Sequence, residues 1–131
     1  MESQMQIGEV AERTGLSLRT IRYYGEVELV TPFSRTEGGF RLYTDADVAK
    51  LELIKQMKPL GYSIEEMREV FDILAELEAG PTAPSREALT ARLITFRNAA
   101  TAGRDKLAAR LAAAESFIEL LDQHVGRKMR T

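Results

Sequence analysis

The chain has 131 residues, of which 44% are hydrophobic, and a formal net charge of −2; this composition allows a modest core and excludes a disordered chain. The sequence contains no cysteine, which excludes disulfides, thiolate metal sites, iron–sulfur clusters and cysteine nucleophiles. Its longest apolar runs fall short of the roughly 20 residues that span a bilayer, and no basic segment followed by an apolar one opens the chain, so we expect a cytoplasmic protein.

The first 26 residues have the pattern of two short helices joined by a tight turn. Apolar residues recur at helical spacing between Ile7 and Ala11, and Gly15 follows them as a stop signal. Ser17 is a favourable N-cap for a second helix, which we expect to bury the face that carries Leu18 and Ile21. This layout is typical of a helix-turn-helix, in which the second helix reads DNA.

The next segment predicts a β-hairpin. Pro32 and the pair Gly38–Gly39 disfavour a helix, and residues 40–43 alternate between apolar and polar side chains in the manner of a strand. We expect the hairpin to turn near residues 37–39. A hairpin that follows a helix-turn-helix is called a wing.

Two capping boxes predict a third and a fourth helix. Thr44 with Asp47 opens the third helix, which ends at the turn 58–61, and Ser63 with Glu66 opens the fourth. The apolar stripes expected on these helices are Val48, Leu51, Ile54 and Met57 on the third, and Ile64, Met67, Phe71 and Leu74 on the fourth.

A long helix is expected over residues 85–124, after a linker at 80–84 and before a short basic tail at 125–131. A helix of about 40 residues would be about 60 Å long, more than the module 1–79 can cover, so its heptad stripe favours a coiled-coil homodimer. An intramolecular hairpin bent at Gly103 is the alternative. The predicted dimerisation residues are Leu89, Leu93, Phe96, Ala100, Leu107, Leu111, Ala114, Phe117, Ile118 and Leu121.

Four spaced motifs resemble the MerR family of transcription regulators. They are Ile7–Ala11 with Thr14–Ser17, then Thr20–Tyr24, Gly39–Tyr43 and Leu60–Ser63, and the likeness extends over about residues 5–78. The resemblance implies a mainly α fold: a winged helix-turn-helix, a second wing between the third and fourth helices, and an antiparallel coiled-coil dimer. It also implies binding of a near-palindromic promoter whose spacer is distorted to control transcription by RNA polymerase.

The chain departs from the family pattern at two positions. Gly25 lies where the family usually has Glu, and Glu28 lies where it usually has Gly. We expect Gly25 to weaken the end of the reading helix. A left-handed backbone at Glu28 would cost roughly 1 kcal/mol.

The candidate DNA contacts are basic, hydroxyl and aromatic residues. A net charge of −2 does not by itself indicate a nucleic-acid partner, so the argument depends on their placement on the second helix and the two wings. Arginine supplies paired donors to guanine or phosphate, and tyrosine hydroxyls donate to phosphate. The alternatives are a solvated helix face for the arginines and core packing for the tyrosines. The predicted set is Ser17, Arg19, Thr20, Arg22, Tyr23, Tyr24, Arg35, Arg41, Tyr43, Lys58 and Tyr62.

The sequence does not suggest an enzyme, a metal site or a cofactor. It has no nucleophile–base pair, metal-ligand cluster or phosphate-binding loop, and His124 is its only histidine. An architectural DNA-bending protein would explain the wing but not the long helix, and a pure coiled-coil scaffold would leave the wing motifs unexplained. The signal stays open between a protein partner, no effector at all, and a small apolar ligand near Phe71, Leu74, Phe96 and Phe117.

Overall fold

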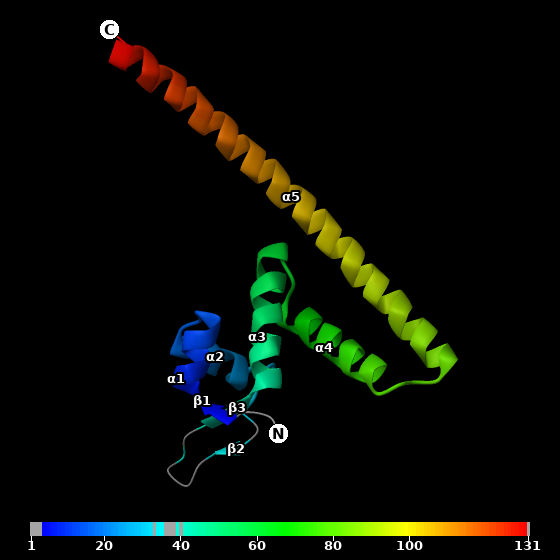
Figure 1. The fold of residues 1–131 in the computed structure, drawn as a ribbon. Helices are drawn as coiled ribbons and strands as arrows, with labels where there is room; N and C mark the ends of the chain where they lie inside the picture. Colours follow the sequence, from blue (N-terminus) through cyan, green and yellow to red (C-terminus); the bar gives the residue numbers. More distant parts are fainter. Residues whose placement is uncertain (1–3, 33, 36–38, 40, 131) are drawn as a thin grey trace. The chain divides into compact units, whose positions relative to one another are not determined.

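A computed structural model describes residues 4–32, 34–35, 39 and 41–130 (Figure 1). Of residues 34, 35, 41 and 128–130 it describes the backbone alone. The chain divides into two compact units, Met1–Leu93 and Ile94–Thr131. In the part of the chain that is described, no helix is long and apolar enough to cross a membrane.

The predicted helix-turn-helix is confirmed. Helix α1 spans Ile7–Thr14 and ends at Gly15, whose φ of 75° lies in the left-handed region and whose N–H donates to the Ala11 carbonyl. Helix α2 spans Leu18–Glu26, and the Ser17 side chain caps it by accepting from the Thr20 N–H. Both helices lie beside α3 (Figure 1), and α1 packs against α2 and α3.

The predicted hairpin is also confirmed, and it belongs to a three-stranded antiparallel sheet of order β1-β3-β2. Strand β2 spans Ser34–Arg35 and β3 spans Arg41–Thr44. The residues expected at the turn lie largely outside the described residues. Strand β1, Gln4–Gln6, was not expected; it pairs Met5 with Tyr43 and makes β3 the central strand.

Helices α3, Asp45–Met57, and α4, Ile64–Glu78, both begin with the predicted capping boxes. A single 3-10 turn, η1 at Lys58–Leu60, ends α3, and Gly61 follows with φ 90°. The buried stripe of α4 differs from the expectation at one position. Leu74 is 40% exposed, whereas Ile73 is 1% exposed. At roughly 100° per residue, Ile73 lies about 200° around the helix from Phe71, so α4 buries a second face as well as the expected stripe.

One hydrophobic core holds the first unit together. Side chains from β1, α1, α2, β3, α3 and α4 form this core. Val48 and Ile64, which were expected in the apolar stripes, are only partly buried against it. Its fully buried side chains include Val10, Ile21, Tyr43, Leu51, Ile54 and Met67.

Helix α5 spans Ala83–Arg130, 48 residues. It begins two residues before the expected start, because a proline such as Pro84 is well placed in a first turn, where no N–H partner is needed. It also continues through the segment expected to be a tail. The helix is unbroken at Gly103, so the hairpin alternative is wrong; glycine weakens a helix without forcing a turn.

Candidate DNA interface

Helix α2 presents a polar face to solvent. Arg19, Arg22 and Tyr23 are exposed, Tyr23 by 46%, while Ile21 is fully buried behind them. The spacing i, i+3 and i+4 places the three polar side chains on one face. Leu18, which was expected to be buried, is 41% exposed. The structure therefore brings together the cationic and phenolic groups predicted to meet base edges and phosphates.

The start of α2 is fixed by two hydroxyl groups. The Ser17 Oγ accepts from the Thr20 N–H at 3.1 Å and donates to the Thr20 Oγ1 at 2.9 Å. Ser17 is exposed and Thr20 is half-buried. Because these hydroxyls order the first helical turn, they position Arg19 and Arg22 whether or not they also meet DNA.

Tyr24 is a correction to the predicted DNA contacts. It is 3% exposed, and its ring lies 5.6 Å from that of Tyr23 between centroids. Burial, and next the neighbouring Tyr23, raise the pKa of the Tyr24 phenol above its ordinary 10.0. Tyr24 therefore supports the reading helix from the core side.

Tyr43 is a second correction. It is fully buried, and its hydroxyl has no hydrogen-bond partner among the described residues. Strand β3 packs against α1 and α3, so the face that carries Tyr43 is covered. Sequence alternation could not reveal this, because β1 and its pairing with β3 were not expected.

The wing places its two arginines at paired positions. The β2–β3 register sets Arg35 opposite Arg41, so their Cα atoms are neighbours across the ladder. Their side chains lie outside the described residues, and their contacts with DNA stay predictions.

The second predicted wing is the turn formed by η1 and Gly61. Lys58 is exposed at its first residue, as a phosphate contact requires. Tyr62 is half-buried and packs against the core, which favours the packing alternative for that residue.

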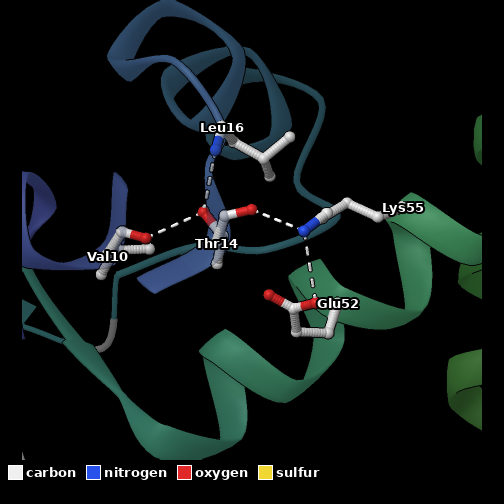
Figure 2. A network of polar contacts seen from close by, with 5 residues as sticks. All are labelled: Val10, Thr14, Leu16, Glu52 and Lys55. Atoms are coloured by element: carbon white, nitrogen blue, oxygen red, sulfur yellow. Dashed lines mark hydrogen bonds and ion pairs between the residues drawn. The ribbon is translucent and has the colours of Figure 1, made fainter. Parts of the chain in front are cut away.

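A polar network that the sequence did not predict ties α3 to the helix-turn-helix (Figure 2). The Lys55 Nζ donates to the Thr14 carbonyl oxygen at 2.6 Å and lies 3.4 Å from a Glu52 carboxylate oxygen. Thr14, 1% exposed, donates from Oγ1 to the Val10 carbonyl oxygen at 2.8 Å and accepts from the Leu16 N–H at 3.2 Å. The network fixes the turn that precedes the reading helix.

The turn after α2 contains a strained residue. Glu28 has φ 58°, the one non-glycine residue with positive φ in the described part of the chain. The N–H groups of Leu29 and Val30 both donate to the Tyr24 carbonyl oxygen, at 2.9 and 3.1 Å. Leu29 and Val30 are then 5% and 1% exposed. The left-handed backbone expected to strain Glu28 is therefore present. The turn that it forms directs the side chains of Leu29 and Val30 into the core.

The predicted dimerisation residues fall into three groups. Leu89 is 7% exposed within the first unit and lines a cavity of about 470 Å³ with Ala79 and Pro81; it packs in its own protomer, a correction to its expected role. Leu93, Phe96 and Ala100 are half-buried. The exposed members are Leu107 at 38%, Leu111 at 61%, Phe117 at 59%, Ile118 at 56% and Leu121 at 47%, together with Ala114.

Two of the four apolar side chains suggested to line a ligand pocket, Phe71 and Leu74, lie in the first unit. Phe71 belongs to the core of the first unit, and Leu74 is exposed. Among the described residues, no group of three or more His, Cys, Asp or Glu side chains could hold a metal ion.

Comparison with known proteins identifies the family of this chain. A family model described as "MerR HTH family regulatory protein" matches residues 5–73, more than half of the chain. The chain belongs to the MerR family. Over 73 residues it is 41% identical to the transcriptional regulator ZntR of Escherichia coli K12, which covers 56% of this chain and 52% of ZntR. Over 67 residues it is 40% identical to the transcriptional activator mta of Bacillus subtilis, which covers 51% of this chain and 26% of mta.

These MerR relatives are transcription regulators by name, and the chain spans about half or less of their length. The fold is shared with HiNmlR, a MerR-family regulator lacking the sensor domain, solved bound to promoter DNA. The TM-score is 0.65 at 23% identity, and the match covers 89% of this chain and 80% of that one.

Proposed function

We propose that this MerR-family chain regulates transcription by binding a near-palindromic promoter as a homodimer. The observation that carries the proposal is the exposed face of α2, where Arg19, Arg22 and Tyr23 stand over the buried Ile21 and Tyr24. Rigid support from the core keeps such groups in place, which favours base reading over loose electrostatic attraction.

The placement of the cations supports this assignment better than summed charge does. The net charge is −2, so the whole molecule does not attract DNA over a distance. The cations gather instead on α2, on the wing strands at Arg35 and Arg41, and on η1 at Lys58. Cations on the reading helix, the wing and the η1 turn fit contacts at successive stretches of a duplex backbone.

The apolar residues exposed on α5 supply the dimer in this proposal. In a single chain, Leu107, Leu111, Phe117, Ile118 and Leu121 leave a large apolar area in water, which marks a protein–protein interface. An antiparallel coiled coil would bury them, and its two-fold axis would match a symmetric DNA site.

Control of transcription follows from DNA deformation. A dimer whose reading helices and wings contact both halves of a site can bend the spacer between them, which changes how RNA polymerase engages the promoter. Acting on promoters would place the protein in the cytoplasm. HiNmlR was solved bound to promoter DNA. That complex supports promoter DNA as the class of target proposed for this chain.

Selection of binding sites from random duplexes tests the proposal. Purified protein should enrich a two-fold-symmetric sequence, bound with two chains per duplex by sedimentation. The matched control is Arg22→Ala, which should enrich a degenerate sequence or none. If the wild-type protein enriches no symmetric sequence, the proposed function is wrong.

A further inference from the structure

A residue distant in the sequence contacts the end of α2. Arg68, on α4, donates a hydrogen bond from Nη2 to the main-chain carbonyl oxygen of Val27. Val27 follows the last residue of α2. The last carbonyls of a helix lack partners within the helix and carry the negative end of its dipole, so a guanidinium group is a well-matched partner.

The carbonyl that Arg68 holds lies next to the strained residue of this turn. Glu28 has φ 58°, a conformation that a side chain with Cβ disfavours. Gly25, in the last turn of the same helix, further weakens its end. The sequence from Gly25 to Glu28 therefore does not favour this turn by itself, and the Arg68 contact adds to the backbone hydrogen bonds that hold it.

The next residue of α4 makes a second long-range contact. Glu69 forms an ion pair with Arg92, near the start of α5 and within the same unit. Two consecutive residues of α4 thus join the end of the reading helix on one side and the first turns of α5 on the other. Arg68 therefore links the end of α2 to α4, and α4 is itself joined to α5 through Glu69.

We infer that Arg68 is a positioning residue for DNA recognition. It holds the C-terminal end of α2 and the left-handed turn at Glu28, and so fixes the angle of the reading helix. The inference rests on the proposed function for its DNA readout. Arg68 itself is half-buried and is not among the predicted DNA contacts.

The test is a double-mutant cycle between Arg68→Met and Glu28→Gly. Binding is measured to the selected symmetric duplex and to an unrelated duplex. Arg68→Met should weaken specific binding about ten-fold, within the range of couplings between residues in contact. Its binding to the unrelated duplex should change less than about two-fold, since no phosphate contact is removed. Arg68→Lys, which keeps a cationic donor, should lie between wild type and Arg68→Met.

The Glu28→Gly background distinguishes support of the turn by Arg68 from simple packing. If Arg68 only packed, its loss would cost the same binding free energy with Glu28 or with glycine at this position. Glycine adopts the left-handed turn without penalty, so the turn then forms without the Arg68 contact. In the Glu28→Gly background, Arg68→Met should cost less than about three-fold in specific binding. Arg86→Met, which removes an exposed arginine of the same unit, controls for the loss of one positive charge.

Amide hydrogen exchange provides a second arm that needs no DNA. The N–H groups of Leu29 and Val30 are bonded to Tyr24 across this turn, and they should exchange about ten-fold faster in Arg68→Met, with restoration by Glu28→Gly. The inference is overturned if the two substitutions are additive in binding, or if exchange at Leu29 and Val30 is unchanged. A wild-type protein without a specific duplex would instead refute the proposed function, and the exchange result would still decide the role of Arg68.

Discussion

The Lys55 ammonium group reaches across from α3 to the last residue of α1, where its Nζ lies 2.6 Å from the carbonyl oxygen of Thr14 (Figure 2). This carbonyl lies at the C-terminal end of α1, just before the turn at Gly15. A cation at a helix C-terminus satisfies a free carbonyl and offsets the helix dipole. The contact therefore fixes the geometry of the helix-turn-helix from outside it.

Replacement of Lys55 by methionine should lower the free energy of unfolding by about 1–2 kcal/mol, because a charge-assisted hydrogen bond is lost from a partly exposed site. Urea denaturation measures this change. Glu52→Gln should cost well under about 1 kcal/mol, since it removes only a surface ion pair. Lys106→Met, on the exposed part of α5, is the matched control. An unchanged urea midpoint for Lys55→Met would show that the Thr14 contact adds no stability.

Arg22→Ala should weaken binding to the selected duplex ten-fold or more, since the loss of a base-reading arginine costs about 1–3 kcal/mol. The side chain is exposed, so circular dichroism and the urea midpoint should match wild type. Competition binding with labelled duplex measures the change. Equal affinities for wild type and Arg22→Ala would remove α2 from the proposed reading face.

The raised pKa of Tyr24 predicts a difference in stability at alkaline pH. Burial favours the neutral phenol in the folded state, so this contribution is present below the unfolded pKa and is lost as the pH rises through the folded pKa. Above about pH 10, the unfolding free energy of wild type should fall more steeply than that of Tyr24→Phe. Urea denaturation over a pH series measures both slopes.

Tyr23→Phe is the matched control for this experiment, because Tyr23 is 46% exposed. It should retain most of the alkaline decline. Identical slopes for wild type and Tyr24→Phe would argue against a buried, neutral Tyr24 phenol.

Leu107→Asp should convert the proposed dimer to monomers, because it places a charge in the apolar stripe of α5. Leu107 is 38% exposed in the single chain, so the first unit should keep its fold. Leu89→Ala is the contrasting variant. It should lower stability by about 2–5 kcal/mol, as for a buried leucine, with the dimer retained. Sedimentation velocity and urea denaturation distinguish the two effects; a dimeric Leu107→Asp would locate the interface elsewhere.

Local signals explain which parts of the fold could be predicted from the sequence. The caps at Ser17, Thr44 and Ser63 and the left-handed Gly15 depend on residues within one helical turn, and all four are present as expected. Such features are specified by neighbouring side chains and backbone groups alone. The exposed polar face of α2 followed from the same short-range spacing.

The errors concern contacts between distant segments. Strand β1 has only three residues, Gln4–Gln6, too few for an alternating pattern, and it forms by pairing with β3. Tyr43, opposite Met5 in that pairing, is buried on the face of β3 that packs against α1 and α3. Leu89 fits the heptad stripe, yet it packs in its own protomer beside the α4–α5 connection. The Lys55 contact with Thr14 joins residues far apart in sequence, and no local pattern encodes it.

A footprint of the purified protein on the DNA upstream of its own coding region, at several salt concentrations, tests the central claim most directly. Promoter distortion by a dimer predicts a protected two-fold-symmetric site across the promoter spacer, with hypersensitive cleavage at its centre. This pattern should persist at salt concentrations that abolish non-specific binding. Diffuse protection that disappears as salt increases, with no symmetric site, would contradict the claim.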